Sequence, residues 1–91
     1  MRIRWTPSAA ADLEQIHQYL EEHLPHLSQK TVLKLYEAIR ALKDSPHRGR
    51  PGREEGTREL VLVPLPYIAV YRVKDEAIEV LHIYHGAQAR A

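Results

Sequence analysis

Basic side chains are concentrated in one short stretch of the sequence. Between Ser45 and Leu60 lie four arginines (Arg48, Arg50, Arg53 and Arg58), three glycines and two prolines. Guanidinium groups bind phosphates and carboxylates through charge-assisted hydrogen bonds. The stretch predicts a shaped basic loop that could meet a phosphate or an acidic protein surface. Arginines that only improve solubility would have the same composition.

A second set of candidate residues lies in the last third of the chain. Its members are Tyr67, Arg72, Tyr84, His85 and Arg90. Histidine titrates near neutral pH and can serve as an acid or a base, whereas aromatic residues in strands most often pack in or beside the core. His82 and His85 fall on opposite faces of one expected strand, and no other histidines have ligand spacing. We therefore expect neither a metal site nor a cofactor.

The composition limits the class of protein. The chain has 91 residues, a net charge of +1, 44% hydrophobic residues and 27% charged residues. These values suit one folded domain over residues 1–91. Cysteine is absent, which excludes disulfides and thiolate metal sites. No apolar run has the length of a signal peptide or a membrane span, so we expect a cytoplasmic protein with no membrane partner.

The first half of the sequence predicts a strand followed by two helices. Residues 2–5 alternate as a short strand does, and Thr6-Pro7 is a typical helix start. Apolar residues then recur at spacings of three and four, first at Leu13, Ile16, Leu20 and Leu24, and later at Val32, Leu35, Tyr36, Ile39 and Leu42. We expect Pro25 to end the first helix and Ser28 to cap the second, which gives an antiparallel helical hairpin.

The second half predicts three strands, at residues 57–63, 67–73 and 77–85, because β-branched and aromatic residues dominate there. Their short connections indicate an antiparallel meander. The predicted fold class is therefore α+β with the order β-α-α-β-β-β. The helical hairpin would cover one face of a small antiparallel sheet and leave the other face partly open.

This element order, the stretch GRPGREEGTRELVLVPLPYIAVYRV and the ending VLHIYHGAQAR together resemble the RelE/ParE superfamily. The resemblance covers essentially the whole chain. It implies the toxin of a bacterial type II toxin–antitoxin pair, of the kind that stabilises plasmids, silenced by a small antitoxin and able to arrest growth when free. RelE-like members cleave messenger RNA in the ribosomal A site, and ParE-like members inhibit DNA gyrase.

The nuclease alternative would use Arg58, Tyr84, His85 and Arg90 as catalytic candidates. Cleavage through the 2′-hydroxyl needs a base, an acid and positive charge beside the phosphate. However, Ile68 stands where nuclease members typically carry an arginine, and the VLH…H…R ending is similar to ParE-like tails. These departures favour gyrase inhibition. Three alternatives remain open, namely mRNA cleavage by a remodelled site, a member that binds its antitoxin but has lost potency, and another target.

If the chain acts by binding, a target or antitoxin would contact the basic loop, the strands and the C-terminal end. The candidates are Arg48, Arg50, Arg53, Arg58, Tyr67, Arg72, His85 and Arg90. The resemblance implies an antitoxin segment that wraps the helix pair and the sheet edge. An exposed sheet edge is also compatible with a homodimer, and the resemblance with a toxin–antitoxin heterotetramer.

Overall fold

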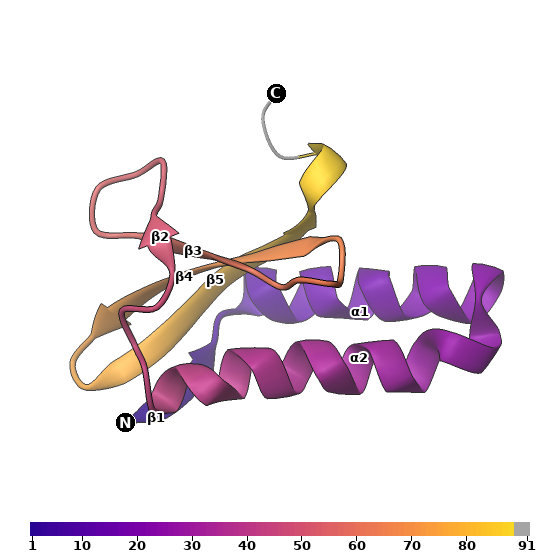
Figure 1. Cartoon of the computed structure of the whole chain (residues 1–91), viewed down its shortest axis with the longest axis horizontal. Helices are drawn as coiled ribbons and strands as arrows, with labels where there is room; N and C mark the ends of the chain where they lie inside the picture. Colours follow the sequence, from indigo (N-terminus) through magenta and orange to yellow (C-terminus); the bar gives the residue numbers. More distant parts are fainter. Residues whose placement is uncertain (89–91) are drawn as a thin grey trace.

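A helical layer covers one face of a five-stranded sheet (Figure 1). The structure, a computed structural model, describes residues 1–88. Its elements are β1 (Arg2–Trp5), α1 (Pro7–His23), α2 (Pro25–Arg40), the 3₁₀ turn η1 (Ala41–Lys43), β2 (Arg50–Pro51), β3 (Arg58–Val61), β4 (Tyr67–Lys74), β5 (Ala77–His85) and the 3₁₀ turn η2 (Gly86–Gln88). The α+β class and the element order are confirmed, and β2 is an additional strand.

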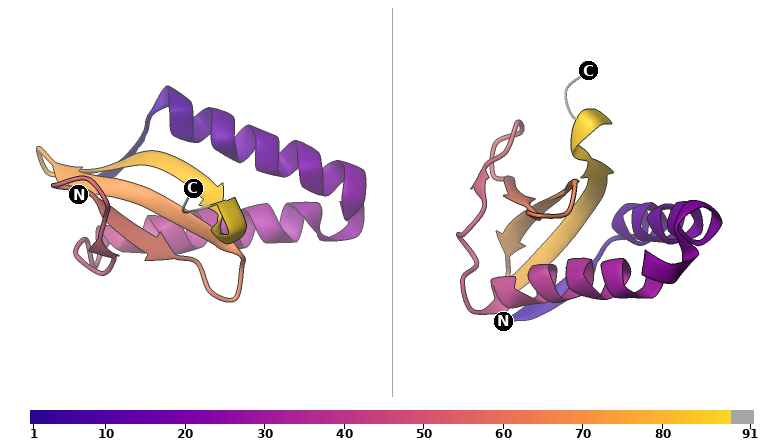
Figure 2. Two further views of the ribbon diagram at one scale, coloured as in Figure 1. Left: turned by 90° about the horizontal axis from the view of Figure 1, so that it is seen from above. Right: turned by 45° about the vertical axis from the view of Figure 1, so that its right-hand side comes forward.

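The sheet has the strand order β1-β5-β4-β3-β2 and is mixed. The expected meander of β3, β4 and β5 is antiparallel, but β1 joins β5 in parallel, with Arg2 opposite Ala77 and Trp5 opposite Val80. The prediction of a wholly antiparallel sheet was therefore wrong at this edge. Figure 2 shows both helices on one side of the sheet, which leaves the opposite face without a helical layer.

Prolines begin both helices. The Thr6 hydroxyl accepts a hydrogen bond from the Ala9 amide at 3.2 Å, as predicted for an N-cap. The second prediction, a cap at Ser28, was wrong because α2 already begins at Pro25, directly after Leu24. Proline suits the first helical position, so Pro25 both ends α1 and starts α2. Ser28 is instead buried inside α2.

The core lies between the helices and the sheet. Leu35, Ile39 and Leu42 contribute its helical side, and Tyr71 and Ile78 are among its fully buried strand residues. The apolar spacing of the second helix predicted three of these positions. Burial of such side chains contributes roughly 1.5–3 kcal/mol each, and it holds the helical layer against the sheet.

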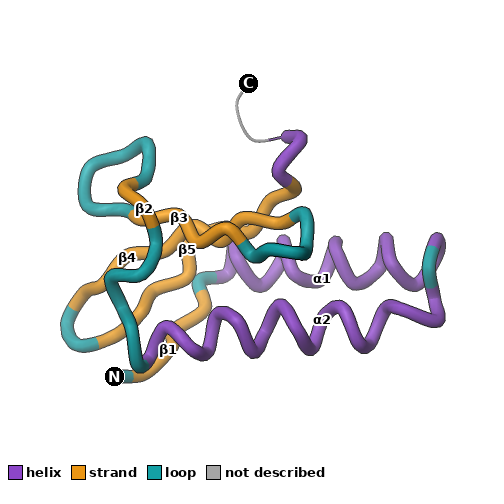
Figure 3. Tube along the Cα trace, viewed as in Figure 1, coloured by secondary structure: helices purple, strands orange, loops and turns teal. Residues whose placement is uncertain are grey.

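The basic stretch forms a hairpin. β2 pairs with β3 through Arg50 opposite Glu59, and the Gly52 amide donates to the Thr57 carbonyl at 2.8 Å. Figure 3 shows the loops on both sides of β2. β3 is shorter than the expected strand over residues 57–63, because the hairpin tip takes up Thr57 and the turn toward β4 begins at Leu62. Neither helix in residues 1–88 is long and apolar enough to cross a membrane.

Candidate functional site

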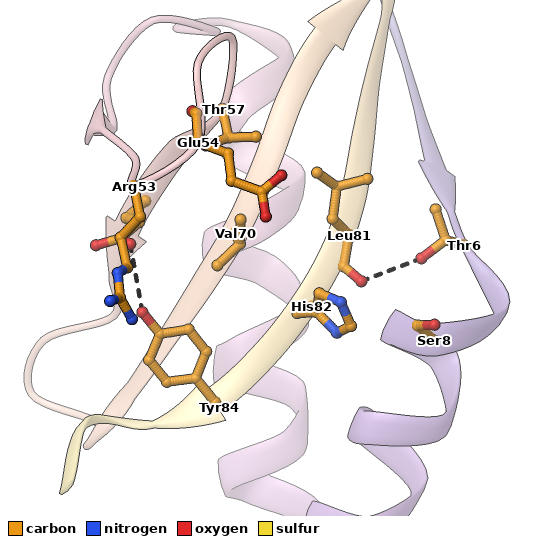
Figure 4. A pocket seen from close by; sticks show the side chains of 10 residues that line it. Thr6, Ser8, Arg53, Glu54, Thr57, Val70, Leu81, His82 and Tyr84 are labelled. Atoms are coloured by element: carbon orange, nitrogen blue, oxygen red, sulfur yellow. Dashed lines mark hydrogen bonds between the residues drawn. The ribbon is translucent and has the colours of Figure 1, made fainter. Parts of the chain in front are cut away.

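A polar hollow of about 530 Å³ lies on the face of the sheet that the helices leave open (Figure 4). Arg53 and Glu54 reach it from the β2–β3 hairpin, and His82 and Tyr84 reach it from β5. Val70 of β4 lies between them. We call this face, together with the hairpin, the open sheet face. It collects several of the candidate residues predicted from the sequence.

A buried carboxylate on this face binds two arginines. The Arg72 Nε donates to the Glu79 Oε1 at 2.5 Å, and Arg4 of β1 forms an ion pair with the other carboxylate oxygen. The hydrogen bonds from Arg4 and Arg72 lower the pKa of Glu79 from 4.5 to about 2. Glu79 is therefore ionised at neutral pH, and Arg72 is already engaged with a negative partner.

A second carboxylate repeats this arrangement two strands away. The Arg50 guanidinium donates to Glu59 Oε1 through Nε at 3.1 Å and Nη2 at 3.0 Å. The Tyr84 hydroxyl lies 3.4 Å from the other oxygen of Glu59. Only 4% of the Glu59 side chain is exposed. Arg50 and Tyr84 thus meet at a shared carboxylate.

Arg58 holds the backbone of the segment before β2. Its Nη1 donates to the carbonyls of His47 at 3.1 Å and Gly49 at 2.7 Å. Tyr71 reaches the same segment from the core, since its hydroxyl accepts from the Gly49 amide and donates to the Pro46 carbonyl. The guanidinium of Arg58 therefore supports the loop instead of pointing to an open position.

Two arginines of the basic stretch remain exposed. Within residues 1–88, the side chains of Arg48 and Arg53 form no hydrogen bond or ion pair. Arg53 lines the polar hollow, with Glu54 beside it. Of the four arginines in the stretch, these two are available to a partner, and Arg50 and Arg58 have contacts inside the protein.

His85 lies apart from the other catalytic candidates. Its ring meets that of Tyr67 edge-on, with centroids 5.6 Å apart and an interplanar angle of 83°. The Ala87 amide donates to the His85 Nδ1 at 3.0 Å, which places the proton of the neutral ring on Nε2. Burial, and secondly the electrostatic interaction with the Tyr19 hydroxyl, raise the pKa of the Tyr67 hydroxyl. Tyr67 is therefore a neutral packing partner.

The proposed catalytic group is not gathered in one place. Tyr84 pairs with Ile68 and His85 with Tyr67 across the β4–β5 ladder, so the two side chains point to opposite faces of the sheet. Arg58 is engaged with loop carbonyls. Arg90 lies outside the described residues. Sequence position alone had grouped side chains that the strand alternation separates.

Sequence reasoning missed the two glutamates that organise this face. Each interrupts an apolar strand, as Glu59 does in RELV and Glu79 in AIEV. A signal was present, because the short turn between β4 and β5 sets Arg72 opposite Glu79. Cross-strand neighbours of opposite charge attract each other. In the described residues, no group of three His, Asp or Glu could hold a metal ion.

A second hollow, which we call the α1–β5 groove, has a volume of about 880 Å³. Tyr19, Leu20 and Leu24 line its helical side, and Ile83 and Tyr67 line its sheet side. β1 pairs with β5 only as far as Val80, so no strand of residues 1–88 lies beside the remaining edge of β5. Asp12 of α1 accepts there from the Ile83 amide at 3.0 Å.

The chain matches known proteins over nearly its full length. The family model of the ParE toxin of the type II toxin–antitoxin system parDE matches residues 3–90. Y4kP of Sinorhizobium fredii is 41% identical over 87 residues, with 96% of this chain and 90% of Y4kP covered. Toxin RelE2 of Caulobacter vibrioides is 37% identical over 87 residues, with 96% and 97% covered.

Two solved toxin–antitoxin structures have the same fold. The chromosomal ParDE system of P. aeruginosa gives a TM-score of 0.86 at 33% identity, covering 93% of this chain and 95% of the other. The RelBE2 complex of Mycobacterium tuberculosis gives 0.65 at 27% identity, covering 92% and 95%. The resemblance noted in the sequence is confirmed, and the chain belongs to the ParE toxin family of type II toxin–antitoxin systems, within the RelE/ParE superfamily.

Proposed function

We propose that this toxin arrests growth by binding DNA gyrase, and that it does not cleave messenger RNA. One observation carries the proposal. The two arginines that strands β2 and β4 carry on the open sheet face are already engaged, Arg72 with Glu79 and Arg50 with Glu59, which leaves Arg53 of the hairpin loop as the unpaired arginine of the hollow within residues 1–88. A phosphate entering this face would meet two guanidinium groups whose charge is already balanced by a carboxylate at hydrogen-bond distance, which weakens the attraction for a second anion.

The position of Ile68 supports the same conclusion. This residue stands where nuclease members carry an arginine, and it is buried between Val61 of β3 and Tyr84 of β5 in the sheet. Losing one group that stabilises transition-state charge costs roughly 100-fold or more in rate. With Arg58 held by carbonyls and His85 on the other face, no unpaired cation of the strands in residues 1–88 lies beside Tyr84, and Arg53, which lines the same hollow, is carried by the hairpin loop.

A binding toxin instead needs an exposed, chemically distinct surface. Arg48 and Arg53 are exposed, and loops on a rigid scaffold commonly carry binding residues. Tyr71 and Arg58 hold the base of the hairpin, so little conformational entropy is lost when the hairpin docks. We infer that the hairpin meets an acidic surface of gyrase.

The test compares both targets with the same purified toxin. Gyrase-catalysed supercoiling of plasmid DNA and cleavage of mRNA on translating ribosomes are measured in parallel. We expect inhibition of supercoiling and no mRNA cleavage. In cells, pulse labelling after induction should show DNA synthesis falling before protein synthesis. Cleavage of mRNA with intact supercoiling would reverse the proposal and return the nuclease alternative.

We also propose that a cognate antitoxin neutralises the chain through the α1–β5 groove. The two similar solved structures are of toxin–antitoxin systems. The groove offers the apolar lining that an amphipathic helix needs, and the edge of β5 beyond Val80, where Asp12 already binds the Ile83 amide, offers its other backbone groups to an extended segment. Co-expression with the antitoxin should restore growth and give a stable complex.

A further inference from the structure

A third hollow lies between β1 and the C-terminal end of α2, away from the open sheet face and the α1–β5 groove. Its volume is about 380 Å³. Arg2 and Trp5 of β1 line it, and so do Tyr36, Arg40 and Lys43. Figure 1 shows the N-terminus beside this end of α2. Nothing in the proposed function uses the hollow.

Spacing on the helix explains how the side chains converge. Tyr36, Arg40 and Lys43 follow one another at i, i+4 and i+7, which places them on one stripe of α2 and η1. The ring of Tyr36 lies parallel to that of Trp5, with centroids 6.2 Å apart and an interplanar angle of 5°. The stripe therefore brings two cations next to a pair of aromatic rings.

The charge of the hollow is not compensated by its lining. Among the described residues, no Asp or Glu lines it. Within residues 1–88, the side chains of Arg2, Arg40 and Lys43 have no hydrogen-bond or ion-pair partner, in contrast to Arg4 and Arg72. Arg2 also lines a neighbouring hollow that contains acidic residues, so Arg40 and Lys43 supply most of the free positive charge.

Cations at the end of a helix have a simpler role, because they stabilise its dipole. That role explains the two exposed cations, and packing against the core explains the position of Trp5, but neither explains why Tyr36 is 45% exposed beside the cations. The negative end of the helix dipole also repels an anion. An anion would therefore bind here only while both Arg40 and Lys43 are charged.

We propose that this hollow binds phosphate groups of a nucleotide ligand, with Arg40 and Lys43 on the phosphate and the exposed part of Tyr36 against the base. Free cations beside aromatic rings are the combination with which proteins bind nucleotides and single strands. The ligand is either a free nucleotide or a nucleic-acid strand. The site is independent of the gyrase proposal, because it shares no residue with the open sheet face.

Trp5 provides the measurement, since it is the only tryptophan in the chain. The purified full chain is titrated with ATP, a short single-stranded DNA and tripolyphosphate while Trp5 fluorescence is followed. We expect saturable quenching by ATP or DNA that weakens with salt. R40Q/K43Q should reduce affinity at least tenfold and lower the salt slope for single-stranded DNA by about 1.4, roughly 0.7 for each lost cation.

K30Q/K34Q is the matched control, because both lysines are exposed on α2 and lie outside the hollow. It removes the same net charge and should keep the wild-type affinity. Quenching by DNA alone assigns the site to a strand, and quenching by ATP assigns it to a nucleotide. The proposal is overturned if no probe saturates with the wild type, if tripolyphosphate binds as well as ATP and DNA, or if both double variants lose affinity equally. If R40Q/K43Q does not fold, the wild-type titration still tests the proposal, because it compares ATP, DNA and tripolyphosphate on the same protein.

Discussion

The hydroxyl of Tyr71 fixes the segment that leads from the helices into the sheet. It accepts from the Gly49 amide at 2.9 Å and donates to the Pro46 carbonyl at 2.8 Å. Gly49 allows this approach, because a Cβ there would lie 2.8 Å from the hydroxyl and 2.9 Å from the Glu59 carbonyl. A buried core residue thus determines where the exposed arginines of the hairpin stand.

Replacing Tyr71 with phenylalanine should lower the free energy of unfolding by about 1–3 kcal/mol, because a buried amide and a carbonyl lose their partner. Urea unfolding of the isolated toxin measures the effect. Tyr36→Phe is the control, since Tyr36 is 45% exposed and its hydroxyl has no hydrogen-bond partner within residues 1–88. Equal stabilities of the two variants would contradict a structural role for the Tyr71 hydroxyl.

The lowered pKa of Glu79 predicts how the stability of the fold changes at acid pH. Because its two arginines lower its folded pKa from 4.5 to about 2, the ionised form contributes stability that is fully present above 4.5 and is lost as the pH falls toward 2. Glu79→Gln removes this contribution. The variant should be less stable than the wild type at neutral pH, and the difference should shrink as the pH falls through that window.

Thermal midpoints measured as a function of pH test this expectation. Glu22→Gln on the exposed side of α1 makes the same change in charge without an ion pair, so its stability should follow the wild type. A difference between Glu79→Gln and the wild type that stays constant across the window would show that the ionisation of Glu79 is not the cause.

Among the elements of the fold, β4 and β5 could be predicted from the residue pattern of the sequence, whereas β2 could not. Alternating β-branched and aromatic residues, with the short Asp75-Glu76 turn between them, predicted both long strands. β2 has only two residues, one of them proline, and exists because β3 and the contacts of Arg58 hold it in place. Such a strand depends on tertiary contacts that no local pattern records.

The same limit applies to the site. The sequence identified the arginines, but their engagement with Glu59 and Glu79 depends on which strands are neighbours. It also grouped Tyr84 with His85, although alternation in β5 sends them to opposite faces. The sequence was enough to select the arginines as candidates. The carboxylate that each arginine binds follows only from the order of the strands in the sheet.

The α1–β5 groove gives a prediction for antitoxin binding. Tyr19 and Leu24 line it and are 56% and 42% exposed. Y19S/L24S should weaken the complex with the antitoxin by more than about tenfold, since each apolar side chain buried in an interface contributes roughly 1.5–3 kcal/mol. Leu33→Ser is the control, because Leu33 is 54% exposed on α2 outside the groove. A titration that gives one dissociation constant for all three proteins would place the antitoxin elsewhere.

At the scale of the whole molecule, the two proposed surfaces lie on different sides of the sheet. The hairpin rises from the open face, and α1 and α2 lie on the other side (Figure 1). His82 and Tyr84 of β5 line both hollows. A large antitoxin could therefore reach around β5 toward the open face, but the exposed arginines of the hairpin remain outside the groove.

This separation predicts that toxicity and neutralisation can be altered independently. R48E/R53E reverses two exposed charges that have no partner in residues 1–88, and should reduce gyrase inhibition at least tenfold because an acidic target would repel it. Antitoxin affinity should stay within about twofold of the wild type, since charges outside a contact change affinity little. K30E/K34E makes the same change in net charge on α2 and should leave both properties intact.

If K30E/K34E weakens inhibition as much as R48E/R53E, net charge alone governs toxicity and the hairpin is not the contact surface. If R48E/R53E instead loses the antitoxin and keeps inhibition, the two surfaces have been assigned to the wrong partners.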